Sequence, residues 1–390
     1  MIYVNKEIEN MRDELTKIRR YFHSYPELSF EEYETSEFIA CFLEKLGIEV
    51  QRNVAKTGVV GFLRCDGAQK TYAFRADMDA LPIDEETGVE FASRKKGVMH
   101  ACGHDGHMAI LLGLAKFLSE NSEKLQANVL FIFQPAEEGA GGAFPMIKEG
   151  ILKKYNVDSI FGLHIFPEIE EGRVGARPGV MMAQTGEIDI KIKGKSGHGA
   201  MPHKTIDSIV AASHFISALQ SIISRNVDPF DSAVITIGRI SGGEKRNIIA
   251  EEVILEGILR AFKEEVFQLL KSRIRDIMVG TERVFGVRIS IDERDLYPAV
   301  YNDEDLFPVL VASVGNENIE IINPLMISED FSYYQKEVPG IFFMLGCKNE
   351  KKGYVHTLHS NKFNFDERVL LIGVQVFVNI LVNLKAFKWT

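Results

Sequence analysis

Residues 98–107 contain the feature that most restricts what this chain can fold into. Their sequence, VMHACGHDGH, places three histidines, a cysteine and an aspartate within ten residues, and an apolar run over 108–118 that predicts a helix follows. Cys102 and His104 lie two positions apart, so in an extended or looped segment their side chains share one face. Thiolate and imidazole are good ligands for zinc and neighbouring transition metals. The alternative is a helix start whose buried histidines hydrogen-bond to the backbone, and the rest of the chain weakens it.

Acidic, cysteine and histidine residues also accompany the apolar runs that predict strands. Run 128–133 is apolar after its first residue, Asn128, as in a strand buried on both faces of a parallel sheet. The ligand site of an open α/β sheet lies outside the carboxyl ends of its strands, so we expect four segments to converge there. They supply Asp77 and Asp79 after 71–76, Cys102 and His104 before 108–118, Glu137 and Glu138 after 128–133, and His164 after 159–163.

From residue 185 onward the pattern is that of a second domain. Strands are predicted at 187–193, 232–240, 251–260 and 287–292, with helices at 205–224 and 264–284. The order βαββαβ is typical of a ferredoxin-like α+β domain. We therefore expect an α/β catalytic domain, with a mostly parallel mixed sheet flanked by helices, that is interrupted by an inserted lid or dimerisation domain. The expected boundaries are 1–184, 185–296 and 297–390.

The two parts of the catalytic domain contain further predicted elements. In the first part, helices are expected at 5–22 and 31–46 and a strand at 59–64. In the second part, a helix at 302–314, a strand at 341–345 and a closing helix at 366–384 are expected.

Composition narrows the class of protein. The 390 residues suit two domains or one domain with an insertion, and a net charge of -10 argues against nucleic acid as a partner. No run of eighteen apolar residues and no secretory apolar segment is present, so we expect no membrane partner and a cytoplasmic location. Because the four cysteines show no paired spacing, a disulfide framework is not expected. Cys41 and Cys347 are interpreted as core residues.

A series of motifs identifies the chain as similar to a known family. They are HSYPEL at 23–28, RADMDALP at 75–82, HACGHDGH at 100–107, QPAEEG at 134–139, GLH at 162–164, SGHGA at 196–200, RNII at 246–249, SEDF at 328–331 and LHS at 358–360. In this order they resemble the M20 metallopeptidase family, and within it the amidohydrolase branch. That branch contains N-acyl-amino-acid deacylases, hippurate hydrolases and N-acetyldiaminopimelate deacetylases.

The resemblance implies a dinuclear metal centre. Its ligands would be Cys102, His104, Glu138, His164 and His359. The first four also follow from the strand pattern, whereas His359 rests on the resemblance, with His356 as the competing candidate. Zinc, manganese, cobalt and nickel all suit a mixed sulfur, nitrogen and oxygen ligand set.

The resemblance also assigns roles close to the metals. Glu137 would be the general base, taking a proton from the metal-bound water and passing it to the leaving amine. Asp79 would accept a hydrogen bond from the ring N–H of a ligand histidine and so fix the orientation of the ring. Asp77 stands where much of the wider family has a histidine, so it remains either a helper or a turn residue. His107, His203 and His214 are expected to be structural or peripheral.

Three residues of the inserted domain complete the expected site. By resemblance, His198 stabilises the oxyanion of the tetrahedral intermediate, often across a dimer interface, and Asn247 holds the substrate. Arg260, on a predicted strand, is a candidate for bidentate contact with the substrate carboxylate, against the alternative of an ordinary arginine on a sheet surface. The resemblance further implies a homodimer or higher oligomer formed through this domain.

The expected function is metal-dependent hydrolysis of N-acyl amino acids, of N-acetyl or N-benzoyl type, to a carboxylic acid and a free amino acid. A carboxypeptidase or dipeptidase with the same chemistry on a peptide bond is the alternative within enzymes. A metal-free binding protein would lack some of the five ligands or Glu137, and all six are present. Reversible oxidation of the Cys102 thiol is a further hypothesis.

Overall fold

The computed structural model describes residues 2–389, which fold into two compact units. Unit 1 comprises residues 2–181, 301–323 and 330–389, and unit 2 comprises residues 182–300 and 324–329. Residues 324–329, which the sequence pattern places with the second part of the catalytic domain, group with unit 2.

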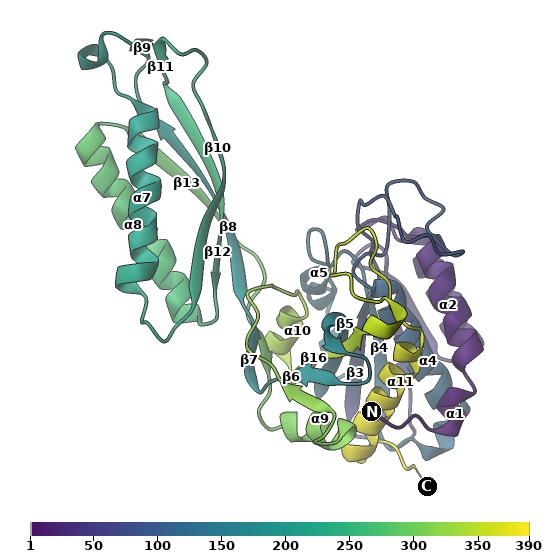
Figure 1. Ribbon diagram of the computed structural model, residues 1–390. Helices are drawn as coiled ribbons and strands as arrows, with labels where there is room; N and C mark the ends of the chain where they lie inside the picture. Colours follow the sequence, from purple (N-terminus) through teal and green to yellow (C-terminus); the bar gives the residue numbers. More distant parts are fainter. Residues whose placement is uncertain (1, 390) are drawn as a thin grey trace. The chain divides into compact units, whose positions relative to one another are not determined.

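Unit 1 is built on an eight-stranded mixed sheet with the strand order β1-β2-β4-β3-β5-β16-β6-β15 (Figure 1). The central strands β4, β3, β5 and β16 are parallel, and β1 and β2 are antiparallel to their neighbours. This confirms the predicted mostly parallel mixed sheet. The strands are β1 (Glu49–Val54), β2 (Gly58–Leu63), β3 (Thr71–Asp77), β4 (Asn128–Gln134), β5 (Ser159–Glu170), β6 (Val174–Ala176), β15 (Ile319–Ile321) and β16 (Gly340–Lys348); β7 (Gly179–Met182) and β14 (Val300–Asn302) form a separate pair.

Helices cover both faces of this sheet. Phe343 of β16 packs against Phe377 of α11, with 6.0 Å between ring centroids, whereas Phe342 packs against Phe331 beside α10 at 5.0 Å. Successive strand residues point to opposite faces, so the two contacts mark the two helical layers. The helices are α1 (Lys6–Glu9), α2 (Arg12–Ser24), α3 (Tyr33–Lys45), α4 (His104–Glu120), α5 (Ala143–Lys148), α6 (Ile151–Lys154), α9 (Phe307–Val314), α10 (Ser332–Glu337) and α11 (Arg368–Asn383).

Two predicted helices of unit 1 differ from the observed ones. The helix expected at 5–22 is divided into α1 and α2, because the Met11 N–H bonds to the Ile8 carbonyl, one residue short of the helical spacing. The helix expected at 302–314 begins only at Phe307. Its first residues form a turn in which the Asp303 carboxylate accepts the N–H groups of Asp305 and Leu306.

The strand expected at 159–163 is longer than predicted. It continues to Glu170, so His164 lies within β5 rather than after it. The neighbouring strand β3 pairs with β5 only as far as Arg75 opposite Gly162, and β3 itself ends at Asp77. His164 therefore still lies near the carboxyl end of β3, beyond the last residue of β5 that pairs with that strand.

Unit 2 has the predicted βαββαβ order. Its four-stranded antiparallel sheet has the order β10-β12-β8-β13, and α7 and α8 cover one face (Figure 1). The elements are β8 (Gln184–Lys193), α7 (Ser208–Asn226), β10 (Ala233–Gly242), β12 (Glu252–Ala261), α8 (Glu264–Phe285) and β13 (Arg288–Asp295), with a short pair of β9 (Gly197–His198) and β11 (Ile248–Ile249). Within residues 2–389, no helix combines the length and the hydropathy needed to cross a bilayer.

Candidate metal centre

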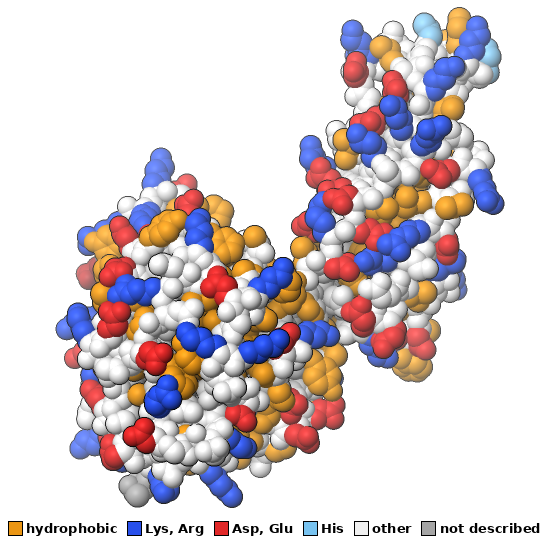
Figure 2. Space-filling model, turned by 180° about the vertical axis from the view of Figure 1, so that it is seen from behind, with side chains coloured by type: hydrophobic (Ala, Val, Ile, Leu, Met, Phe, Trp, Pro, Cys, Tyr) orange, Lys and Arg blue, Asp and Glu red, His pale blue; other side chains and the backbone are white. Residues whose placement is uncertain are grey.

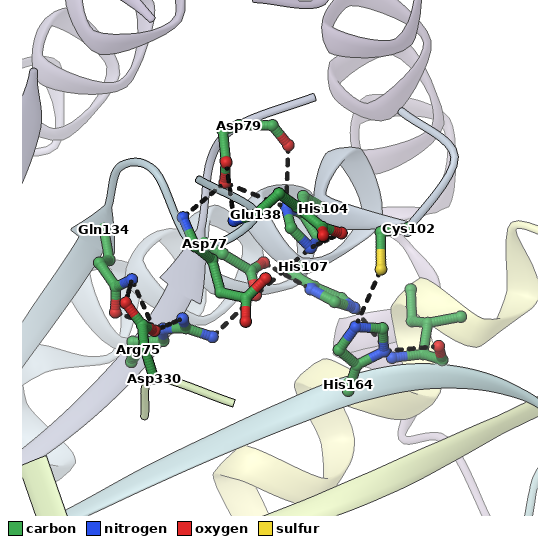
Figure 3. A network of polar contacts seen from close by, with 12 residues as sticks. Arg75, Asp77, Asp79, Cys102, His104, His107, Gln134, Glu138, His164 and Asp330 are labelled. Carbon is green, nitrogen blue, oxygen red and sulfur yellow. Dashed lines mark hydrogen bonds and ion pairs between the residues drawn. The ribbon is translucent and has the colours of Figure 1, made fainter. Parts of the chain in front are cut away.

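Two glycines position the start of α4 against β5. Gly103 adopts φ +87°, a left-handed conformation that favours glycine, and it lets the chain turn into α4 directly after Cys102. A Cβ at Gly106 would lie 2.6 Å from Cδ1 of Ile165, so any larger residue would push the side chain of Ile165 away from α4. As a result the Cys102 Sγ lies 3.4 Å from the Nε2 of His164 (Figure 3).

The predicted ligands fall into two groups that share Cys102. The ligand-type atoms of Cys102, His104 and His164 all lie within 4.8 Å of one another. The same holds for Cys102, Glu138 and His359. His359 reaches this position because its N–H bonds to the carbonyl of Ala101 at 2.9 Å and its φ is +62°. Among residues 2–389, the competing candidate His356 belongs to no such group.

The chemistry of these groups fits divalent metal ions. Nε2 of His104 is buried and has no hydrogen-bond partner, and the buried Oε1 of Glu138 faces other candidate ligands. Buried polar atoms without a partner are costly, and such atoms in a native protein call for an explanation. Nε2 of His359 lies 3.1 Å from Oε1 of Glu138 and Nε2 of His104 lies 3.9 Å from it, so the atoms point into one small volume. A cation there would satisfy all of them.

The pKa values of two candidate ligands, Cys102 and His164, bear on metal binding. Burial, together with the carboxylates of Glu138 and Glu137, raises the pKa of the Cys102 thiol well above its ordinary value. Burial lowers the pKa of His164 to about 3, which keeps this imidazole neutral and free to ligate. A thiol must lose its proton to bind a metal, and a dication supplies the positive charge that the buried thiolate needs. We therefore expect metal binding to release a proton from Cys102.

Asp79 anchors the segment that carries the two glutamates. Its Oδ1 accepts the N–H of Glu137 and its Oδ2 the N–H of Glu138, both at 3.0 Å, while the Ser29 hydroxyl donates to Oδ2 at 2.6 Å. The sequence suggests that this carboxylate accepts a hydrogen bond from a ligand histidine. In the structure Nδ1 of His104 lies 2.8 Å from the backbone carbonyl of Asp79 and 3.4 Å from its Oδ1. The closest acceptor for His104 is thus the main chain of Asp79. The Asp79 carboxylate instead holds the loop that carries Glu137 and Glu138.

Asp77 is not a turn residue but the centre of a buried network (Figure 3). Its Oδ2 accepts from Nη1 of Arg75 at 2.7 Å, and its Oδ1 lies 2.6 Å from Nδ1 of His107. Arg75 also donates to Gln134 at 2.9 Å and to Asp330 at 2.8 Å. Arg75 is a functional residue that the sequence motifs alone do not reveal. The available signal was an arginine inside an otherwise apolar strand, because a buried arginine requires charged partners.

In unit 2 the structure brings together two of the three predicted residues. His198 on β9 pairs with Ile248 of β11, and the Gly199 N–H donates to the carbonyl of Asn247 at 2.9 Å. The Ala200 N–H lies 3.1 Å from Nδ1 of His198, so in the neutral ring the proton is on Nε2. His198 is exposed, and histidine side chains are visible at this end of unit 2 in Figure 2.

Arg260 lies elsewhere in unit 2. β12 begins at Glu252, shortly after Asn247 in the sequence, and Arg260 lies near its other end. The eight residues from Glu252 to Arg260 correspond to about 26 Å of strand. Nη1 of Arg260 donates to the carbonyl of Met326 at 2.8 Å. Within the unit, Arg260 is therefore separated from His198 and Asn247.

The comparison with known proteins decides the family, because residues 73–383 match Peptidase family M20/M25/M40. The chain belongs to this family. It is 43% identical over 373 residues to the N-acetyldiaminopimelate deacetylase of Bacillus cytotoxicus, covering 95% of this chain and 97% of that protein. The M20 chain is thus a metal-dependent hydrolase of amide bonds.

Solved structures of two relatives agree with the fold. The crystal structure of a presumed aminohydrolase from methicillin-resistant Staphylococcus aureus is similar with a TM-score of 0.92 and 38% identity, over 97% of this chain and 98% of that chain. The YXEP protein of Bacillus subtilis, a dinuclear metal-binding peptidase of the M20 family, has a TM-score of 0.85 and 33% identity, over 97% of this chain and 100% of that chain.

In this M20 enzyme, Glu32 holds the start of the loop that carries Glu137 and Glu138. Its Oε1 accepts the N–H of Ala136 at 2.9 Å, and its Oε2 accepts from the Thr57 hydroxyl at 2.6 Å. Ala136, which directly precedes Glu137, has φ +55°, a conformation that is strained for a residue with a side chain. Burial raises the pKa of Glu32 to about 7, although the Thr57 hydroxyl opposes this shift.

Glu32→Gln is expected to change how the stability of the metal-free protein depends on pH. The folded-state pKa of Glu32 is about 7 and its ordinary value is 4.5, so the folded state binds more protons between these values. The contribution of Glu32 to stability is therefore complete below pH 4.5 and is lost as the pH rises through 7, by up to about 3 kcal/mol. Unfolding by urea at a series of pH values measures this, and the wild type should lose stability relative to Glu32→Gln over that window. If the difference in unfolding free energy between the two proteins did not change with pH, the raised pKa of Glu32 would be contradicted.

Proposed function

We propose that this protein hydrolyses the amide bond of an N-acylated amino acid, releasing a carboxylic acid and a free amino group. The observation that most directly supports this reaction is the arrangement of the candidate ligands. Both ligand groups share Cys102, and a carboxylate oxygen of Glu137 lies within 4.8 Å of the ligand atoms of His104 and Glu138. The acyl group is proposed to be acetyl, and N-acetyldiaminopimelate is the first candidate substrate, because the 43% identical relative carries that name.

The proposed roles divide between metal ions and side chains. Two divalent ions, of zinc, manganese, cobalt or nickel, would be held by Cys102, His104, Glu138, His164 and His359; when bound, they lower the pKa of water and polarise the amide carbonyl. Glu137 takes the proton from the attacking water and later gives it to the nitrogen of the leaving amine. Asp79 keeps Glu137 in place through its main chain.

Residues of unit 2 are proposed to bind the substrate. His198 offers an exposed Nε2–H, which is a suitable donor to the oxyanion that forms when the carbonyl is attacked. Asn247 lies beside it and is proposed to hold the substrate. Because Arg260 is separated from His198 and Asn247 within the unit, it is proposed to contact the carboxylate of a substrate whose oxyanion is bound by His198 of a second copy. The contact would use the donors of Arg260 that Met326 does not occupy.

We propose a homodimer formed through unit 2. β10 is an edge strand of the sheet, and Ile240 on it is 57% exposed, as expected for a surface that a second copy covers. Light scattering measures the oligomeric state directly, and a monomer at micromolar concentration would contradict the proposal.

A peptidase activity is the second candidate, favoured by the 33% identity to the YXEP protein. The two functions are separated by measuring free amine released from N-acetyldiaminopimelate, other N-acetyl and N-benzoyl amino acids, and dipeptides. Each substrate is tested with metal-loaded protein and with protein treated with a chelator. We expect turnover of acetylated substrates that depends on metal. Turnover of dipeptides alone would favour the peptidase, and no release from any substrate with any of the four metals would contradict both.

A further inference from the structure

We propose that His107 is a positioning residue that sets the orientation of the candidate ligand His164 through the main chain of Ile165. The inference rests on the proposed metal-binding role of His164. His107 is buried, on the first turn of α4, three residues after His104, so the two rings project from neighbouring positions of the helix.

The two histidines contact the main chain of the same residue of β5. The Ile165 N–H donates to Nε2 of His107 at 2.8 Å, and Nδ1 of His164 lies 2.8 Å from the carbonyl of Ile165. Nε2 of His164 then lies 3.4 Å from the Cys102 Sγ. The position of the Ile165 backbone thus determines where His164 presents its ligating nitrogen, and His107 fixes that backbone.

The hydrogen-bonding partners of His107 define its tautomer. A backbone N–H can only donate, so Nε2 of His107 is the acceptor and carries no proton. The proton is therefore on Nδ1, which donates to Oδ1 of Asp77 at 2.6 Å. Both ring nitrogens are used in this way. Although His107, Asp77 and His104 are close enough to hold a metal, the neutral ring of His107 has no lone pair left for one.

Asp77 holds the ring of His107 in a fixed position. Its other oxygen is held by Arg75 at 2.7 Å, and Arg75 is fixed by Gln134 and Asp330. These contacts link β3 and β4 to His107, which in turn contacts β5. On the β16 side the sheet holds this part of β5, because Met344 and Leu345 pair with His164 and Ile165. On the β3 side the pairing ends at Gly162, two residues before His164, and His107 takes the place of the missing strand contact there.

Two variants separate the two hydrogen bonds of His107. In His107→Asn the short amide can still donate to Asp77 but has no acceptor at the position of Nε2. In His107→Gln the longer amide places its oxygen near the position of Nε2 and keeps an acceptor for Ile165, while the bond to Asp77 is lost. Each variant loses one buried hydrogen bond, so the two are matched in their expected cost to the fold. His214→Asn, at an exposed position on α7, is the control for a histidine outside the site.

The experiment measures Co²⁺ binding to metal-free protein by calorimetry and by cobalt–thiolate absorption, together with the thermal unfolding of the metal-free form. We expect His107→Asn to weaken the binding of one of the two ions by about 10- to 100-fold, and His107→Gln to weaken it by less than about threefold. The metal-free melting temperatures of the two variants should be similar.

Three outcomes of the Co²⁺-binding experiment would contradict the proposed role of His107. Wild-type affinity in His107→Asn would overturn the positioning role while leaving the metal centre intact. An equal loss in both variants would also overturn it, since the loss of affinity would then not depend on the bond to Ile165 in particular. If the wild-type protein itself binds no Co²⁺, the metal assignment fails and the role of His107 fails with it.

Discussion

Glu137→Gln is expected to lower the rate of amide hydrolysis by about 10²- to 10⁴-fold while two metal ions remain bound. Glutamine has nearly the same shape as glutamate but cannot accept the proton of the attacking water. The main-chain contact between Glu137 and Asp79 does not involve the substituted group, so the loop should keep its conformation. Steady-state kinetics with an acetylated substrate and elemental analysis of the same sample measure both parts of this prediction.

Glu138→Gln is the matched comparison for this prediction. The two glutamates are adjacent, but the carboxylate of Glu138 belongs to the group formed with Cys102 and His359. We therefore expect Glu138→Gln to lose metal as well as activity. If Glu137→Gln kept more than about a tenth of the wild-type rate, or if it lost metal as readily as Glu138→Gln, the assignment of Glu137 as the general base would be wrong.

Cys102→Ala is expected to abolish tight binding of both ions, because Cys102 is the one residue common to both ligand groups. His164→Ala removes a ligand from one group only and His359→Ala from the other, so each should leave one ion tightly bound. Activity should fall by more than about 100-fold in Cys102→Ala, since the ions supply both the activated water and the polarised carbonyl. Metal content after dialysis against a weak chelator provides the measurement.

The three variants test how the groups are connected. Loss of a single ion in Cys102→Ala would show that the thiolate serves only one site. Loss of both ions in His164→Ala and in His359→Ala would show that the two sites do not bind independently. Circular dichroism of the metal-free proteins serves as the control for folding, since all three side chains are replaced by alanine in the same way.

The convergence of the site could be predicted because it follows from the topology of a parallel sheet. Asp77, Glu138 and His164 come from three different strands or the loops after them, and the rule that ligands gather at carboxyl ends brings them together. The rule succeeded for His164 even though β5 extends to Glu170, because the adjacent strand β3 ends sooner. Fold class was accessible for the same reason, since buried strands and helices have distinct apolar patterns.

Contacts between residues distant in sequence could not be predicted from these patterns. His359 is brought to Ala101 by a single backbone hydrogen bond and a left-handed conformation, which no periodicity encodes. Likewise, Asp79 is a carboxylate at a strand end by sequence, but only the structure shows that its oxygens bind two backbone N–H groups. His107 was interpreted as structural or peripheral. Its link between Asp77 and Ile165 depends on the packing of α4 against β5.

The most direct test of the metal centre is anomalous diffraction from crystals of the protein grown with manganese. We expect two anomalous peaks in each chain, one within bonding distance of Cys102, His104 and His164 and one within bonding distance of Cys102, Glu138 and His359. A single peak, or peaks that do not contact Cys102, would contradict this assignment.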